Sequence, residues 1–185
     1  MGRFAKGLCF SIALLMSAPA GATLVRAVPM RALTAQAHEI VRGHVVDSEC
    51  LYDPVFRRVY THTRVAVLET LAGDTRPMSV IEVRQIGGLL DGVESRVVGT
   101  AKLGMGAEVI LFTRTDGAHH YLMGMAQGAF AVDRRHPGTT TLHRETGDLR
   151  ITPPFGPAAK LAPDRLTLDT LRELVEAERG EGVRP

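Results

Sequence analysis

The clearest pattern in the chain is an alternation of side chains between Val59 and Leu71. A period of two residues is typical of a β-strand with one face against a core and the other toward solvent. The face expected to meet the core carries Val59, Thr61, Thr63, Val65 and Val67. The opposite face carries Tyr60, His62, Arg64 and Ala66. The segment is therefore predicted to be a half-buried strand.

Shorter apolar or β-branched runs, separated by turn residues, predict the other strands. They cover residues 23–29, 40–46, 79–86, 109–112, 121–123, 129–132 and 139–142, the last as a short edge strand. The run 109–112 is apolar at every position, which is typical of a central strand covered on both faces. Asp116–Gly117 follows it with a strong hairpin signal, whereas the glycine-rich stretch from Gly87 to Gly106 is expected to be a long loop. About seven short strands with turns between them favour a mainly β fold, an OB-like closed or partly open barrel.

Two helices are expected, one before most of the strands and one after them. Residues 30–37 contain helix formers and are long enough for about two turns. The second helix is predicted to begin near Thr167, whose hydroxyl can cap free backbone donors, with Leu166 and Leu171 clamping the entry. Gly180 is expected to end it. Its apolar stripe, which should pack on the barrel, comprises Leu168, Leu171, Leu174 and Val175.

The expected organisation of the chain has four parts. Residues 1–22 form a signal peptide, 23–150 the β-barrel domain, 151–165 a connector with four prolines, and 166–180 the helix that packs on the barrel. In the first part, an apolar run from Gly7 and a small-x-small ending at Ala20 and Ala22 are typical of secretory signals. Cleavage is expected after Ala22, which predicts a secreted or periplasmic protein. The alternative is a buried amino-terminal helix.

Removal of the signal peptide changes the charge balance. Arg3 and Lys6 leave with it, so the 22 basic residues of the whole chain become 20, against 20 acidic ones. A neutral domain has no strong field for polyanions, which argues against a nucleic-acid partner. No later apolar run reaches the roughly 18 residues of a membrane-spanning helix, so no transmembrane segment is expected in the mature chain. Cys50 is its single thiol, expected to be buried and inert, with an intermolecular bridge or a free thiol as alternatives.

Seven histidines raise the question of a metal site: His38, His44, His62, His119, His120, His136 and His143. No His-Glu-x-x-His or Cys-x-x-Cys spacing occurs, although His44 and His62 could meet across neighbouring strands. Histidines on the wet face of a strand are commoner than metal ligands, and solvent exposure beside a hairpin turn explains His119 and His120. No metal-binding residue is therefore assigned.

Signatures of catalysis and of cofactor binding are also missing from the sequence. Gly-x-Ser-x-Gly does not occur, and the Gly99–Gly104 spacing lacks the lysine of a phosphate-binding loop because Met105 stands in its place. A Cys50–histidine pair and a pair of strand carboxylates stay open, since such sites are spatial. The candidate carboxylates are Glu49, Glu69, Glu82 and Glu108. No catalytic or cofactor-binding residue is assigned, and no cofactor is expected.

Three motifs carry a resemblance to known proteins. They are Ala37-x-x-Ile-Val-Arg-Gly-His-Val-Val, Leu103-x-x-Gly106-x-Glu108-Val-Ile-Leu-Phe and Ala126-Gln-Gly-x-Phe-x-Val. Over residues 23–180 the chain is similar to a group of uncharacterised, signal-bearing bacterial secreted proteins, and it distantly resembles the OB-like barrels of netrin modules and tissue inhibitors of metalloproteinases. Those inhibitors bind a protease zinc through an amino-terminal Cys. The mature chain would begin with Thr23, so no inhibitory residue is carried over.

The resemblance and the missing catalytic signatures favour a non-enzymatic binding or interaction module of unknown ligand. Such barrels present a strand face or loops to a partner, here expected to be another protein of the cell envelope or exterior. The Gly87–Gly106 loop is long enough to be functional. The alternative is a small metal-dependent hydrolase using His and Glu side chains on the barrel. A third hypothesis is an assembly role through Cys50.

Overall fold

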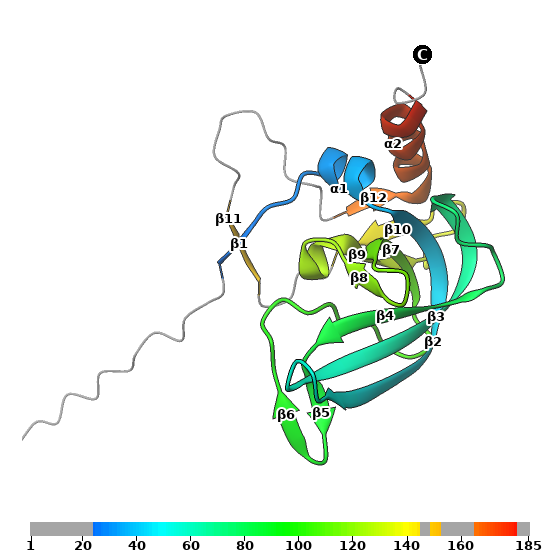
Figure 1. Ribbon diagram of the computed structural model, residues 1–185. Helices are drawn as coiled ribbons and strands as arrows, with labels where there is room; N and C mark the ends of the chain where they lie inside the picture. Colours follow the sequence, from blue (N-terminus) through cyan, green and yellow to red (C-terminus); the bar gives the residue numbers. More distant parts are fainter. Residues whose placement is uncertain (1–23, 145–148, 153–164, 181–185) are drawn as a thin grey trace, which may run out of the picture.

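The computed structural model describes residues 24–144, 149–152 and 165–180 (Figure 1). The predicted signal peptide and most of the predicted connector lie outside these described residues. Within them the chain is mainly β, as predicted, with a large sheet, a ring of five strands and a carboxy-terminal helix. The sheet continues beyond the ring, which agrees with the partly open form of the predicted barrel.

The elements of the described residues fall into one large sheet, two small sheets and three helical segments. The large sheet contains β2 (Glu39–Asp53), β3 (Arg58–Ala72), β4 (Val80–Ile86), β7 (Glu108–Thr115), β8 (His120–Leu122), β9 (Ala129–Asp133), β10 (Thr141–His143) and β12 (Arg165–Thr167). The small sheets pair β1 (Leu24–Arg26) with β11 (Arg150–Thr152) and β5 (Gly88–Leu90) with β6 (Val93–Ser95). The helices are α1 (Met30–Gln36), the 3₁₀ turn η1 (Met125–Gly128) and α2 (Leu168–Gly180).

The ring closes because β8 pairs with both β7 and β4. One edge of β7 pairs with β2, which pairs with β3, and β3 pairs with β4. The other edge of β7 is divided, pairing first with β9 and further along with β8. The seam of the ring is a parallel contact between β8 and β4, at the single pair Val83 and His120. From β9 the sheet continues through β10 to β12.

The strands β2 and β3 form one long hairpin of 15 residues on each side, much longer than the predicted strand 40–46. The register shifts between Arg42 and Gly43, which marks a β-bulge or irregularity there. A Cβ added at Gly43 would lie 2.5 Å from the Ala66 carbonyl oxygen, so only glycine permits this close approach. At the turn, Asp53 Oδ1 accepts the Val55 and Phe56 N–H groups at 2.9 and 3.0 Å.

The helices α1 and α2 lie side by side and cover one end of the large sheet (Figure 1). As predicted, the Thr167 hydroxyl caps α2 by accepting the Thr170 N–H at 3.1 Å. Arg179 of α2 donates to the carbonyl oxygens of Thr34 and Ala37 at the end of α1, at 3.2 and 2.5 Å. The core beneath the helices comprises Met30, Leu33, Ala37, Ile40, Ala72, Ile110, Phe112, Met123, Phe130, Leu142, Leu168, Leu171 and Val175. The predicted stripe of α2 is therefore the face that packs on the sheet.

A second core lies inside the ring of strands. It comprises Val41, Val45, Val65, Val67, Ile81, Val83, Val109, Leu111 and Ala129. The prediction that Val65 and Val67 face a core is confirmed, and the predicted covered strand at 109–112 is buried throughout. Val59 and Thr61 are only partly buried, because this end of β3 leaves the ring and runs into the long hairpin.

Three expectations about individual segments are corrected by the strand pairing. The predicted edge strand at 139–142 is β10, which pairs on both sides, with β9 and with β12, so β12 follows it toward the edge. The predicted Gly87–Gly106 loop contains the β5–β6 hairpin. Part of the expected connector pairs as β11 with β1. Among the described residues, no helix combines the length and the hydrophobicity that crossing a bilayer requires.

Candidate functional site

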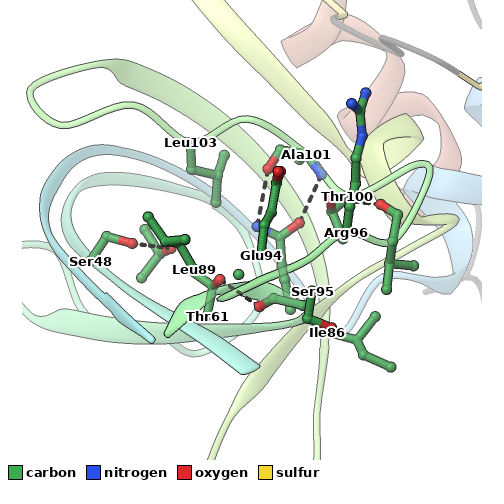
Figure 2. Close-up of a pocket in the computed structure, with 15 residues that line it drawn as sticks. Ser48, Thr61, Ile86, Leu89, Glu94, Ser95, Arg96, Thr100, Ala101 and Leu103 are labelled. Atoms are coloured by element: carbon green, nitrogen blue, oxygen red, sulfur yellow. Dashed lines mark hydrogen bonds between the residues drawn. The ribbon is translucent and has the colours of Figure 1, made fainter. Parts of the chain in front are cut away.

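A pocket of about 310 Å³ lies where the long hairpin meets the β5–β6 hairpin (Figure 2). Its walls come from the inner face of β2 and β3, the end of β4, the β5–β6 hairpin and the segment that follows it. The lining residues are Ser48, Thr61, Thr63, Gln85, Ile86, Gly87, Gly88, Leu89, Glu94, Ser95, Arg96, Val97, Thr100, Ala101 and Leu103. The pocket is therefore built largely from the Gly87–Gly106 stretch that sequence analysis singled out.

A row of hydroxyl groups on β2 and β3 forms one wall of the pocket (Figure 2). Ser48 Oγ and Thr63 Oγ1 lie 3.4 Å apart across the two strands, and Thr61 Oγ1 donates to the Gly87 carbonyl oxygen at 2.8 Å. Cys50 Sγ lies 3.4 Å from Thr61 Oγ1. The thiol is free and only partly buried, so the expectation of a buried Cys50 is wrong. This wall offers uncharged polar groups to a ligand.

Gln85 fastens the opposite wall to the end of β4. Its amide group makes two hydrogen bonds with the Ala101 backbone, donating from Nε2 to the carbonyl oxygen at 3.2 Å and accepting the N–H at 2.8 Å. Two hydrogen bonds from one side chain fix both the position and the direction of the 97–103 segment. The pocket is therefore held open by a side-chain clamp as well as by strand pairing.

Two consecutive glycines make the tight approach at the base of the pocket possible. Gly87 and Gly88 have φ angles of +94° and +137°, which favour glycine over other residues. A Cβ added at Gly88 would lie 2.5 Å from both Cys50 Sγ and Thr61 Oγ1. The β5–β6 hairpin can thus lie directly on the β2–β3 wall.

Exposed apolar side chains gather on the two hairpins that flank the pocket. Six of the eleven large exposed hydrophobic residues among the described residues lie there: Leu51, Tyr52, Val55, Phe56, Leu89 and Val93. Val55 is 82% exposed and Val93 is 70% exposed. We call the six residues Leu51, Tyr52, Val55, Phe56, Leu89 and Val93 the hairpin-end surface.

Arg84 stabilises the turn end of the β2–β3 hairpin. Its guanidinium stacks on the Tyr60 ring at 3.8 Å and pairs with Asp53.

A second cluster of functional side chains lies on the outer face of the ring, beside its seam. His62 Nδ1 of β3 is 2.8 Å from Glu82 Oε1 of β4, and His119 Nε2 is 3.3 Å from the same oxygen. One ligand atom from each of the three residues lies within 4.8 Å of the others. The side chains are 11%, 35% and 26% exposed for His62, Glu82 and His119, so the cluster is accessible from solvent.

Asp116 holds the turn that carries His119. Its Oδ1 accepts the N–H groups of Ala118 and His119 at 3.0 and 2.8 Å, and its Oδ2 accepts the Tyr121 hydroxyl at 2.8 Å. The His119 backbone bond and the Tyr121 bond lower the pKa of Asp116 from 3.8 to about 2. The carboxylate therefore stays charged and fixes His119 beside β4 over a wide pH range.

The other candidate residues of the sequence analysis do not assemble into a site of this kind. The register places His44 opposite Ala66 and His62 opposite Glu49, so the two histidines do not meet. Glu69 and Glu108 belong to ion pairs that join elements: Glu69 binds Arg42 and Arg172 of α2, and Glu108 binds Arg42 and Arg134. Hydrogen bonds from Arg134 lower the pKa of Glu108 and keep it ionised. These carboxylates connect strands and helix rather than facing a substrate.

The solvent-exposure explanation of His119 was incomplete. Its backbone does lie in the predicted hairpin turn, but its ring contacts the His62 ring at a centroid distance of 5.6 Å. His62 and Glu82 both occupy outward-facing positions of strands in which inward and outward side chains alternate. That alternation can be recognised in the sequence. The approach of β8 to β4 is not visible there, because a parallel contact between strands separated in the chain leaves no local pattern.

Comparisons with known proteins add no family to these observations. No protein-family model matches the chain, and no curated protein matches it. The resemblance to netrin modules and tissue inhibitors of metalloproteinases therefore stays a prediction. The pocket, the hairpin-end surface and the His62–Glu82–His119 cluster are the features on which a functional proposal can be based.

Proposed function

We propose that the protein is an exported, non-enzymatic interaction module that binds another protein of the cell envelope or exterior. The proposed docking site is the hairpin-end surface together with the pocket between the two hairpins. The occupant we propose is an extended, mainly uncharged segment of the partner. The observation that carries this proposal is that six of the eleven large exposed hydrophobic residues among the described residues lie on the two hairpins that flank the pocket, with Leu89 in its lining.

The apolar part of the site can supply binding free energy. Leu89 lines the pocket and is 62% exposed, and Phe56 is 59% exposed on the neighbouring hairpin. Burying apolar surface contributes about 25 cal/mol per Å², and exposed apolar groups that lie together are typical of interaction sites. A partner covering both hairpin ends would remove this surface from water.

The polar part of the site favours an extended chain as the occupant. Within the described residues β6 pairs with β5 alone, so its second edge offers backbone N–H and carbonyl groups. An extended peptide can add to such an edge, while its side chains enter neighbouring pockets. The hydroxyl wall of Ser48, Thr61 and Thr63 can hydrogen-bond uncharged polar groups without demanding a charge.

The proposal can be tested by partner capture with two matched double variants of the full-length chain. The first, Leu89→Ser with Val93→Ser, removes one apolar group from each face of the β5–β6 hairpin, Leu89 on the face that lines the pocket and Val93 on the other. The control, Met78→Ser with Met105→Ser, removes apolar side chains that are 88% and 64% exposed elsewhere. Capture from a cell-envelope extract of the source organism is quantified by mass spectrometry.

We expect the amount of partner captured by the first variant to be at least about 10-fold lower than that captured by the wild type, because loss of the apolar surface of two side chains weakens binding by about 1.4 kcal/mol or more. The control should capture as much as the wild type. Equal capture by both variants, or no specific capture by the wild type, would contradict the proposal. Matching thermal unfolding midpoints of the three proteins show that the loss reflects binding rather than folding.

A small metal-dependent hydrolase is the second candidate function. It is favoured by one observation, the convergence of His62, Glu82 and His119 on the outer face of the ring. Three protein ligands with an accessible fourth position are typical of catalytic zinc sites. This candidate requires metal binding first, and a chain that binds no metal through these residues would eliminate it.

A further inference from the structure

We propose that His62, Glu82 and His119 form a binding site for one divalent transition-metal ion, and that Zn²⁺ fits their donor set. The site lies on the outer face of β3, whereas the pocket uses the inner face of the same strand through Thr61 and Thr63. Metal binding is therefore independent of the docking proposal and can be tested separately.

The spacing of the ligand atoms fits a small tetrahedral ion. Zinc lies about 2.0–2.2 Å from imidazole nitrogen and carboxylate oxygen, which places tetrahedral ligand atoms about 3.4 Å apart. The distance from His119 Nε2 to Glu82 Oε1 is 3.3 Å, and that from His62 Nδ1 to the same oxygen is 2.8 Å. Small rotations of the His62 and Glu82 side chains are enough to admit the ion.

The chemistry of the donors selects among metals. Two imidazoles with one carboxylate suit zinc, copper, nickel and iron, whereas magnesium and calcium prefer sites made of oxygen ligands alone. Water can complete the coordination sphere because the three side chains are partly exposed. The site should therefore bind Zn²⁺ and show no binding of Mg²⁺.

The surroundings leave the Glu82 carboxylate available to a cation. Arg64 lies opposite Glu82 in the register of β3 and β4, but its guanidinium pairs with Asp47 of β2. Among the described residues, the short polar contacts of Glu82 are with the two imidazoles. Glu49 lies opposite His62 on β2 and adds a further negative charge near the cluster. Arg64 also interacts electrostatically with Glu82 and Glu49, and Arg84 lies opposite His62. The short contact of Arg64 is with Asp47, so the Glu82 oxygen that faces the two imidazoles stays available to a cation.

Metal binding requires that His62 Nδ1 and His119 Nε2 carry no proton. Without metal, an N–H group at His62 Nδ1 can donate to Glu82 Oε1 at 2.8 Å, and His119 Nε2 lies 3.3 Å from the same oxygen. With metal, these nitrogens present lone pairs, so the protons lie on the opposite ring nitrogens. Acid competes with the metal for the same lone pairs, and affinity should therefore fall as pH falls.

The test is calorimetric titration of the tag-free, full-length chain with ZnCl₂ at pH 7.5, after removal of metal by a chelator and dialysis. We expect one equivalent of Zn²⁺ per chain, a dissociation constant in the micromolar range or tighter, and no heat with MgCl₂. Zn²⁺ should also raise the thermal unfolding midpoint by about 5 °C when it is present at 100 times its dissociation constant.

Substitutions assign the binding to the three residues. Glu82→Gln is nearly isosteric and should weaken Zn²⁺ binding at least about 10-fold, and His62→Ala and His119→Ala should do the same. The matched control is His136→Ala, since His136 is an exposed histidine outside the cluster. It should bind like the wild type.

Two results would overturn the proposal. The first is binding of less than one Zn²⁺ per wild-type chain, and the second is an unchanged Zn²⁺ affinity in all three variants of the cluster. If an alanine variant fails to fold, Glu82→Gln still decides, because its unfolding midpoint without metal should equal that of the wild type. A Zn²⁺-induced rise of the midpoint in Glu82→Gln as large as in the wild type would also refute the site.

Discussion

Apolar side chains are buried at one end of the β2–β3 hairpin and exposed at the other. At the helix-covered end, Leu33, Phe112 and Leu171 are fully buried between the sheet and two helices. At the other end, Val55 and Leu89 lie mostly in solvent on hairpins that no further element covers in the described residues. Stability is therefore concentrated at one end, and the other end can change its surface without unfolding the protein.

Leu171→Ala should have the largest effect, because it opens a cavity under α2 in the helix-covered core. Truncation of a fully buried leucine costs about 2–5 kcal/mol, and we expect about 3 kcal/mol here. The free energy of unfolding in urea, followed by circular dichroism, measures it. Leu89→Ala, the same change at the exposed end, should alter stability by less than about 0.5 kcal/mol. Similar losses in the two variants would abolish the distinction between the ends.

Gln85→Ala should have an intermediate effect, because it releases the clamp on the 97–103 segment at the exposed end. Two lost hydrogen bonds correspond to about 1–2 kcal/mol. Hydrogen exchange of the Ala101 amide should accelerate, and urea unfolding gives the energy. The control is Gln36→Ala, which removes the same type of side chain where it makes one exposed hydrogen bond with Arg114. It should lower the free energy of unfolding by less than about 0.5 kcal/mol. An unaltered Ala101 exchange rate would show that strand pairing alone holds the pocket.

A smaller effect on stability, dependent on pH, is expected at His120, which pairs with Val83 at the β4–β8 seam of the ring. Partial burial lowers the pKa of His120 from 6.5, so the folded state favours the neutral ring. The unfolded chain then binds more protons below pH 6.5, and this contribution to stability is complete above that pH and declines as pH falls toward the lowered pKa.

The wild-type urea midpoint should therefore drop between pH 7.5 and pH 5.5. His120→Gln should reduce that drop, whereas His136→Gln should leave it unchanged. The window lies above the range in which the carboxylates with lowered pKa values, such as Asp116 and Glu108, take up protons. An identical pH dependence in the wild type and in His120→Gln would show that burial of this ring contributes nothing.

Much of the fold could be predicted, because its signals are local. The Thr167 cap and the leucine stripe identify α2, period-two alternation identifies β3, and Asp116–Gly117 identifies the β7–β8 turn. The β5–β6 hairpin was missed although Asp91–Gly92 carries the same kind of signal, with φ angles of +50° and +78°. Its strands have three residues each, too few to show an alternation.

The candidate sites were harder to predict, because they depend on contacts between distant segments. The hydroxyl wall is formed by inward positions of β2 and β3, which look like ordinary core positions until the hairpin leaves the ring. The His62–Glu82–His119 cluster needs the parallel contact of β8 with β4, and one pair of residues defines it. Sequence patterns record which face a side chain occupies but not which distant strand lies beside it.

The brevity of that β4–β8 contact also bears on how the molecule fluctuates. Every other pairing in the ring extends over three residue pairs or more, so the seam is where backbone hydrogen bonds are fewest. Local openings concentrate where cooperative contacts are sparse. Thermal breathing of the ring should therefore begin between β4 and β8, admitting water to the interior from that side while the rest of the sheet keeps its shape.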